Sequence, residues 1–336
     1  MIDVLRRRAF LAAAATALAG CGGAAPVPPP APKPDEPPPL RVPELTKLLP
    51  LAGLRWLILA APRDIASAPG LIPAITRIAP EQNLDRFAAH TGFDLRQIPE
   101  AAIAAYAGDA TLYLLRHNGD RAAIERLFRA RLTSGEHRAV DRADVVRVSG
   151  KIGRTPATMV VLGGDVVAYQ FGGSASRGPA RIASLYARDL LKKSPTVMSE
   201  DPVKALAARL GTAPLRAFAV GPFEGELTRG ARGLLAGATA IGGTVRPSAR
   251  DGLLVVIAVA GDFSKSAEPA SRELVTAWDE LAGGSFGHLL GLDQPIERPL
   301  ATHAADAVTV AVEIDPGKLA KGIAAATSAR LEEIMR

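Results

Sequence analysis

The sequence contains a single cysteine, Cys21, and few aromatic residues, which make up 4% of the chain. One cysteine excludes intramolecular disulfides, thiolate zinc clusters and haem attachment. The scarcity of aromatic side chains argues against platforms that stack sugars or single-stranded nucleic acid. No uncharged apolar run after residue 23 reaches the roughly 18 residues that a membrane-spanning helix needs. We therefore expect a mature chain that is stabilised by packing and does not span a membrane.

Motifs that mark catalytic, cofactor or metal sites are also missing. None of the five histidines lies three or four residues from another, so no helical metal pair is predicted. Ser174 lies at an expected strand-to-helix junction but lacks the glycine two residues later that a nucleophile elbow requires. Gly317-Lys318 lacks the preceding glycine and the following hydroxyl residue of a phosphate loop. The sequence thus predicts no catalytic, cofactor-binding or metal-binding residue and favours a protein that is not an enzyme.

The charge of the chain is low for its length. The formal net charge of +6 includes Arg6, Arg7, Arg8 and Asp3 in the first 20 residues, and falls to +4 without them. The remaining basic residues are scattered along the sequence, with Lys192-Lys193 as the one adjacent pair. This pattern predicts a solvated, arginine-rich surface and no nucleic-acid partner.

The most informative stretch is the N-terminus, from Arg6 to Gly23. Three arginines precede an uncharged run from Ala9 to Gly20 that ends in small residues, which is the pattern of an export signal. As a helix, this run would reach about 18 Å, less than the roughly 30 Å hydrocarbon core of a bilayer. The pattern favours a signal peptide over residues 1–20 rather than a permanent span.

Leu18-Ala19-Gly20-Cys21 resembles the lipobox of bacterial lipoprotein precursors. The resemblance implies cleavage before Cys21, a diacylglycerol on its sulfur and a membrane anchor. Arg7, Arg8, Phe10 and Leu11 also resemble the core of a twin-arginine export signal, although general secretion stays open. Gly22 is not the aspartate associated with inner-membrane retention in some bacteria. The resemblance therefore implies an exported protein of the cell envelope, with the periplasmic face of the outer membrane favoured.

A proline-rich segment follows the cysteine. Ten of the residues from Ala24 to Pro43 are prolines, and proline fixes φ and removes backbone donors. We expect residues 21–44 to form the lipidated cysteine and an extended, disordered tether of roughly 60 Å.

The folded region is expected to be α+β, with two related sandwich-like halves of mainly antiparallel sheet covered by helices. The first half spans 45–193, a linker 194–214 and the second half 215–336. Leu215 to Pro222 echoes Leu54 to Pro62, and Asp306 before a strand echoes Asp165. This order resembles that of uncharacterised extracytoplasmic lipoproteins, in pattern alone. Expected strands and helices alternate along both halves, and their ranges are 54–62, 103–106, 111–115, 145–148, 157–162, 166–171, 215–222, 238–245, 253–260 and 307–314 for strands, and 83–90, 121–131, 179–192, 227–235, 267–281 and 316–335 for helices.

Three functional hypotheses follow from these patterns. The first is a lipid-anchored, non-catalytic envelope protein that binds or scaffolds another envelope component. The second is a carrier of an apolar ligand in a cleft between the two halves. The third is an extracytoplasmic hydrolase built from scattered serine, histidine and aspartate side chains.

Overall fold

Twelve strands of the computed structural model form a single antiparallel sheet. The structure describes residues 38–68, 71–72, 75–76, 79–191 and 194–322. Arg7, Arg8, Phe10, Leu11 and Cys21 lie outside these residues, as does most of the proline-rich tether. The strands are β1 (Leu54–Ala60), β2 (Glu100–Tyr106), β3 (Ala110–Arg116), β4 (Ser134–Arg142), β5 (Val145–Ile152), β6 (Thr155–Leu162), β7 (Val166–Phe171), β8 (Leu215–Val220), β9 (Ala238–Pro247), β10 (Leu253–Gly261), β11 (Glu297–Ala304) and β12 (Ala307–Ile314).

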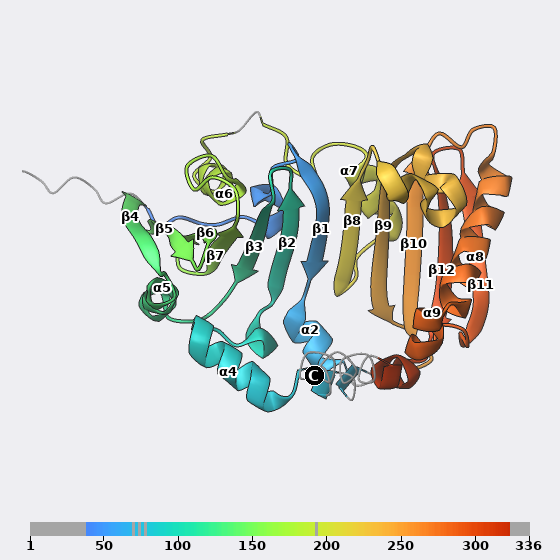
Figure 1. Ribbon diagram of the computed structural model, residues 1–336, viewed down its shortest axis with the longest axis horizontal. Helices are drawn as coiled ribbons and strands as arrows, with labels where there is room; N and C mark the ends of the chain where they lie inside the picture. The colour runs from blue at the N-terminus through green and yellow to red at the C-terminus, as the bar shows by residue number, and fades with distance from the viewer. Residues whose placement is uncertain (1–37, 69–70, 73–74, 77–78, 192–193, 323–336) are drawn as a thin grey trace, which may run out of the picture. The chain divides into compact units, whose positions relative to one another are not determined.

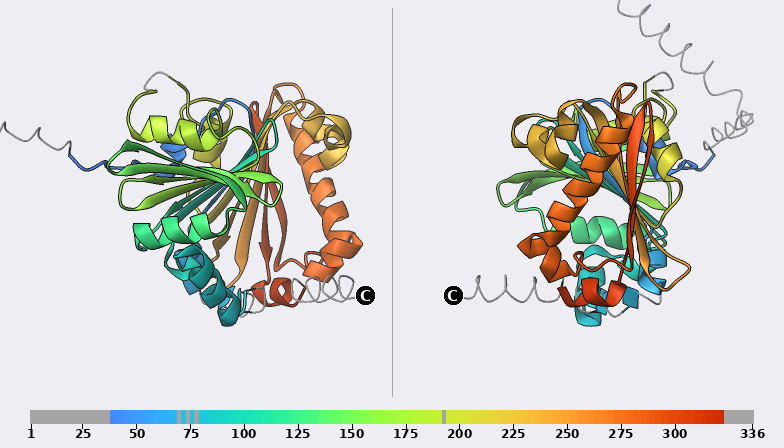
Figure 2. Two further views of the ribbon diagram at one scale, coloured as in Figure 1. Left: turned by 60° about the vertical axis from the view of Figure 1, so that its left-hand side comes forward. Right: turned by 90° about the vertical axis from the view of Figure 1, so that its right-hand side faces the viewer.

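Helices cover both faces of this sheet (Figures 1 and 2). The α-helices are α2 (Pro62–Ser67), α4 (Glu81–Thr91), α5 (Arg121–Ala130), α6 (Pro179–Ala187), α7 (Val203–Leu210), α8 (Ala267–Gly283) and α9 (Ser285–Leu290), and the 3-10 helices are η1 (Leu45–Leu48), η3 (Leu95–Gln97) and η4 (Gly225–Ala236). Residues 316–322 are also helical. The α+β class with antiparallel strands is thereby confirmed.

The sheet consists of two stretches with the same topology. The first runs β1-β2-β3-β7-β6 and the second runs β8-β9-β10-β12-β11, while the β4–β5 hairpin extends the first. The strands that echo each other in the sequence, β1 with β8 and β7 with β12, occupy matching places. The two stretches are therefore topological repeats, as the sequence pattern suggests.

The two repeats share one sheet, which differs from the expectation of two separate sandwiches. β1 and β8 pair antiparallel, and Leu57 lies opposite Phe218. The two segments that resemble each other in sequence begin with Leu-Arg at Leu54 and Leu215. Leu57 and Phe218 are each the fourth residue of their segment, so the sequence repeat relates the same two residues. A local pseudo-two-fold axis consequently passes through this pair. The expected linker 194–214 also contains α7, which packs on β9 and β10.

Three clusters of buried side chains form the core. The first lies on one face of the sheet, where η1, α6 and α7 cover it. The other face carries two clusters, one beneath α5 in the first repeat and one beneath α8 in the second. Figure 2 shows the first repeat's strands between α6 and α5. On the second face, α5 and α8 thus cover the two ends of the sheet, and neither of these helices lies over β1 and β8.

Residues that typically begin or end helices occupy those places in the structure. Gly92 ends α4 with φ of 86°, a conformation that glycine adopts readily. The Asp120 side chain accepts from the N–H groups of Ala122 and Ala123 at the start of α5. Asp315 accepts from Gly317 and Lys318 at the start of the last helix, whose residues beyond 322 lie outside the described part.

Other local expectations differ from the structure. Helix α6 ends at Ala187 instead of Lys192, and the expected α-helix 227–235 is the 3-10 helix η4. Leu281, expected on the inner stripe of α8, is 51% exposed, and Ala282 is buried instead. Strands β4 and β11 were not expected. Both are edge strands exposed to solvent, so they lack the apolar alternation that reveals a half-buried strand.

Candidate functional site

An apolar trough lies on the second face of the sheet, where β1, β8, β9 and β10 cross the junction of the two repeats. It has a volume of about 380 Å³ and is lined by Trp56, Leu57, Ile58, Ala217, Phe218, Ala219, Ile241, Gly242, Gly243 and Ile257. Every one of these residues is apolar or glycine. The trough therefore offers no charged side chain and no side-chain hydroxyl or carboxylate to a ligand.

The strand register explains why the sheet is hollow here. Ile58 lies opposite Ala217, Ala217 opposite Gly243, and Gly243 opposite Ile257. This row across four strands has a large side chain at each end, Ile58 and Ile257. The two middle positions, Ala217 and Gly243, carry a methyl group and a hydrogen. Adjacent strands are about 4.8 Å apart, so the row is roughly 14 Å long.

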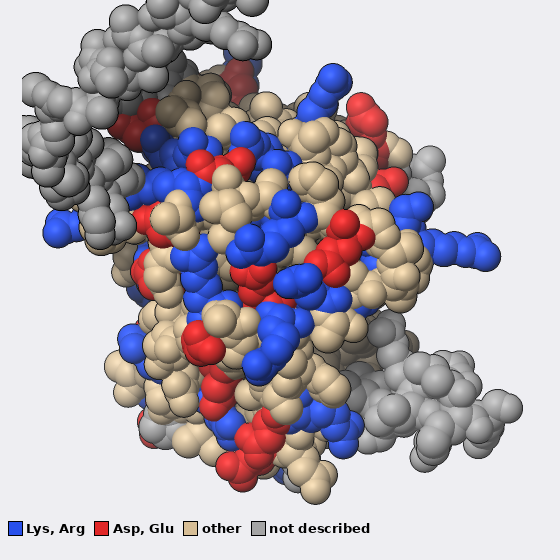
Figure 3. All heavy atoms as spheres, turned by 90° about the vertical axis from the view of Figure 1, so that its left-hand side faces the viewer, with Lys and Arg blue, Asp and Glu red and all other residues tan. Residues whose placement is uncertain are grey.

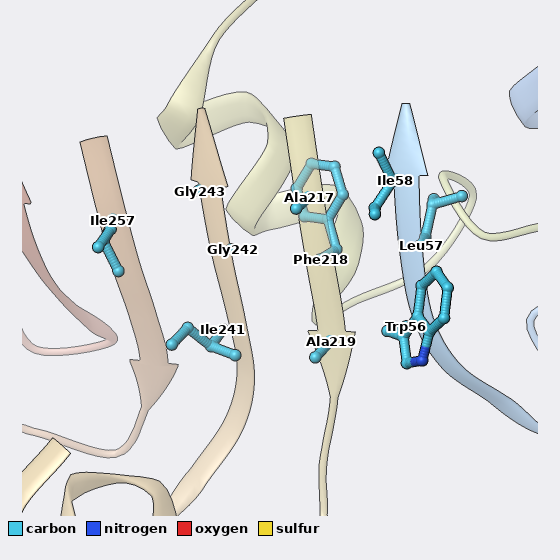
Figure 4. A pocket seen from close by; sticks show the side chains of 10 residues that line it. All are labelled: Trp56, Leu57, Ile58, Ala217, Phe218, Ala219, Ile241, Gly242, Gly243 and Ile257. Carbon is cyan, nitrogen blue, oxygen red and sulfur yellow. The ribbon is translucent and has the colours of Figure 1, made fainter. Parts of the chain in front are cut away.

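A second row runs beside the first one. Trp56 lies opposite Ala219, which in turn lies opposite Ile241. The indole of Trp56 is 39% exposed and stands at one edge of the trough (Figure 4). Trp56 and the isoleucines thus form walls above a floor of alanine and glycine.

The floor is closed from below by the core of the opposite face. Leu57 and Phe218 belong to the cluster covered by α7, with exposed fractions of 0% and 2%. Because side chains alternate along a strand, these two point away from the trough. A methyl group on Gly242 would meet Leu206 and Leu210 of α7, whereas one on Gly243 would meet only the Val256 carbonyl and Ile257. Gly242 thus packs against α7, and Gly243 opens the trough.

The asymmetry between the repeats makes this hollow. Trp56 and Ile58 of β1 correspond in the repeat to Ala217 and Ala219 of β8. Two large side chains in one repeat are therefore matched by two methyl groups in the other. A symmetric pair of strands with large residues in both positions would fill the space.

Ser174 and the aspartates Asp141 and Asp144 do not come together as a catalytic group. The Ser174 hydroxyl lies 3.1 Å from that of Ser176. Asp141 pairs with Arg181, and Asp144 accepts from the Leu40 N–H at 2.7 Å. Within the described residues, no group of three or more His, Asp or Glu side chains could hold a metal. In the same residues, no helix is long and apolar enough to cross a membrane.

His117 is buried, although its position at the end of a strand suggests a surface or capping side chain. It is only 4% exposed, and its ring stacks on Phe93 with the centroids 6.3 Å apart. Its Nδ1 accepts from the Gly119 N–H at 3.2 Å, while the buried Nε2 has no partner. Burial lowers the pKa of His117 below its ordinary value of 6.5, so the imidazole is neutral in the folded protein.

This burial predicts an acid-sensitive stability. In the unfolded chain, His117 is protonated near pH 6.5, whereas in the folded protein protonation requires a lower pH. The free energy of unfolding should therefore fall as the pH drops from 6.5 towards the lowered pKa of His117. Urea unfolding at pH 7.5 and pH 5.5 measures the difference. His117→Asn, which keeps an acceptor for Gly119, should reduce that difference; an unchanged pH dependence would contradict the assignment.

The sequence analysis did not identify the trough residues, although it placed a possible apolar cleft between the halves. A signal existed in the repeat itself, where Trp-Leu-Ile of β1 aligns with Ala-Phe-Ala of β8. Gly242-Gly243 within a strand was the second signal, because interior glycine often marks a place where something approaches the backbone closely. Their coincidence on one face requires the strand register.

Comparisons with known proteins found distant structural similarity alone. No family model matches the chain, and no curated protein matches it in sequence. Two crystal structures of TP0453 are similar in fold. Crystal form IV has a TM-score of 0.49 at 11% identity and covers 84% of this chain and 97% of TP0453. Crystal form I has a TM-score of 0.43 at 10% identity and covers 84% and 98%.

Proposed function

We propose that this protein is exported, anchored to the cell envelope through a lipid on Cys21, and binds one apolar chain in the trough. The observation that carries the binding proposal is the recessed, wholly apolar floor of Ala217, Ala219 and Gly243. This favours the second hypothesis, a carrier of an apolar ligand. The anchor rests on the lipobox-like sequence, with the periplasmic face of the outer membrane as the proposed location.

The shape of the trough selects the class of ligand. Sites for small molecules have volumes of about 300–1,000 Å³, and the 380 Å³ here lies near the lower limit. A narrow, flexible hydrocarbon chain can reach the floor between Trp56 and Ile257. A flat protein surface would be held away from the floor by the Trp56 indole and the isoleucines. An acyl chain of a lipid or a fatty acid therefore fits best.

Burial of such a chain is favourable without any polar contact. Each methylene removed from water contributes about 0.8 kcal/mol, so several methylenes on the apolar floor supply measurable affinity. The polar head of the molecule would remain outside the trough, since the lining carries no charged side chain and its one polar side-chain atom is the Trp56 indole nitrogen. Binding should accordingly depend on chain length more than on head-group chemistry.

Quenching by a brominated fatty acid locates the chain. The protein has two tryptophans, Trp56 at the trough and Trp278, which is a residue of α8 that is 6% exposed. In the Trp278→Phe variant, Trp56 is the reporter, and we expect saturable quenching by the brominated chain. In the matched Trp56→Phe variant, Trp278 should remain largely unquenched.

The anchor is tested in the same material. Cys21→Ala should abolish lipid attachment and leave an uncut or soluble protein, while Trp56 quenching persists in the soluble form. A processed Cys21→Ala protein that stays in the membrane would contradict the anchor. Equal quenching of both tryptophans, or of neither, would contradict the trough as the binding site.

A further inference from the structure

The basic side chains that are scattered in the sequence gather at one end of the sheet. Between the start of α5 and the end of α6, residues 121–187 hold eleven Lys and Arg residues and five Asp and Glu residues, a net charge of +6. The chain from residue 21 onward has a net charge of +4, so its remainder carries −2. The excess of positive charge therefore belongs to one stretch of the protein.

This stretch forms the outer end of the first repeat, with the β4–β5 hairpin as its edge. Figure 3 looks onto that end, and Lys and Arg side chains extend over it with Asp and Glu between them. We call this surface the basic edge and define it by α5, β4, β5, the β5–β6 turn and the loop before α6.

Part of the basic edge is internally neutralised. Arg129 pairs with Glu136 and Arg138 with Glu125. Besides Arg126 on α5, three exposed cations differ, because no carboxylate of the described residues lies within 4.0 Å of Lys151, Arg154 or Arg177. These three are available to an anionic partner.

Lys151, Arg154 and Arg177 come from neighbouring segments. Lys151 on β5 lies opposite Pro156, and Arg154 occupies the turn between these two residues. The Gly172 N–H donates to the Pro156 carbonyl at 2.9 Å, which brings the loop containing Arg177 to the same end of the strands. The fold therefore groups three cations that are spread over 26 positions of the sequence, from Lys151 to Arg177.

The chain enters the fold in the first repeat, at the opposite ends of β5 and β6 from Lys151 and Arg154. The Leu40 N–H donates to Asp144 in the β4–β5 turn at 2.7 Å, and the Pro43 carbonyl accepts from Arg116 at 2.7 Å. Whatever holds the chain through Cys21 is thus connected to the fold beside the basic edge. A membrane anchor at Cys21 would thus be tethered to the first repeat rather than the second, through a segment with an expected reach of roughly 60 Å.

We propose that the basic edge binds the anionic head groups of the membrane that carries the anchor. The proposal relies on the anchoring proposed above but not on ligand binding in the trough. Its physical basis is the attraction of Lys and Arg to a negatively charged lipid surface, which acts within a Debye length. Binding would orient the protein with the β5–β6 turn and the loop before α6 toward the membrane.

Vesicle co-sedimentation of the unlipidated protein tests the proposal. The probe is residues 21–336 with Cys21→Ala, mixed with vesicles of phosphatidylglycerol and phosphatidylcholine or of phosphatidylcholine alone. We expect binding to the anionic vesicles, weaker binding as salt rises, and about a tenfold or greater loss in the Lys151→Gln, Arg154→Gln, Arg177→Gln triple variant.

A matched triple variant separates position from net charge. Arg246→Gln, Lys265→Gln and Arg298→Gln remove the same charge from exposed positions in the second repeat and should leave vesicle binding nearly unchanged. Equal loss in both variants, no binding to anionic vesicles, or tighter binding to a DNA duplex than to these vesicles at equal salt would overturn the proposal. Because the protein carries no lipid, this result is independent of whether Cys21 is the anchor.

Discussion

Gly242→Ala is expected to destabilise the protein by about 1–3 kcal/mol, the usual cost of overpacking a core. A methyl group at this position would lie 2.8 Å from Leu210 Cδ1, 2.9 Å from Leu206 Cδ2 and 3.0 Å from Phe218 Cδ1. All three neighbours are themselves buried, with α7 held against the sheet. The strain must therefore move α7 or distort β9, and thermal and urea unfolding would measure the loss.

The adjacent glycine provides the control. At Gly243, the nearest atoms to an added methyl group are the Val256 carbonyl oxygen at 3.4 Å and Ile257 Cγ1 at 3.9 Å. Because alanine loses less backbone entropy on folding than glycine, Gly243→Ala should preserve stability or raise it by up to about 1 kcal/mol. Similar destabilisation by both substitutions would contradict the assignment of Gly242 to the α7 face and Gly243 to the trough.

The sequence was sufficient for most of the fold because buried strands and amphipathic helices leave periodic patterns. The continuous runs of β6, β7 and β10 and the caps of α5 and the last helix are of this kind. Strand β4 left no such pattern, since residues such as His137 and Arg138 are exposed on an edge. Its existence depends on pairing with β5, which is a tertiary contact.

The trough could be predicted only in part for a similar reason. The sequence contains the small residues of β8 and the two glycines of β9, but a hollow requires them to lie side by side on one face. The pairing of Ala217 with Gly243 provides that, and it arises from the register between β8 and β9. The basic edge likewise depends on tertiary structure, because Lys151 and Arg177 are brought to one end only by the pairing of β5, β6 and β7.

The trough exists because the two repeats differ, and restoring their similarity should abolish binding. Ala217→Trp with Ala219→Ile gives β8 the side chains that β1 has at Trp56 and Ile58. About the pseudo-two-fold axis through Leu57 and Phe218, these side chains would cover the floor as their counterparts cover Ala105 and Ile103. We expect the affinity for a dansyl-labelled fatty acid, measured by dansyl emission, to fall about tenfold or more, because the methylenes lose their apolar contact area.

The fold should tolerate this double substitution, since the new side chains enter open space and keep the strand pattern of large apolar residues. Circular dichroism and the unfolding midpoint establish that point. Ala301→Ile, at a half-buried position on edge strand β11, adds a branched side chain to a strand outside the trough and should leave binding unchanged. Retained affinity in a folded Ala217→Trp, Ala219→Ile protein would place the ligand elsewhere, whereas loss in both variants would indicate a general effect on the sheet. Loss confined to the double variant would place the ligand in the trough that the difference between β1 and β8 creates.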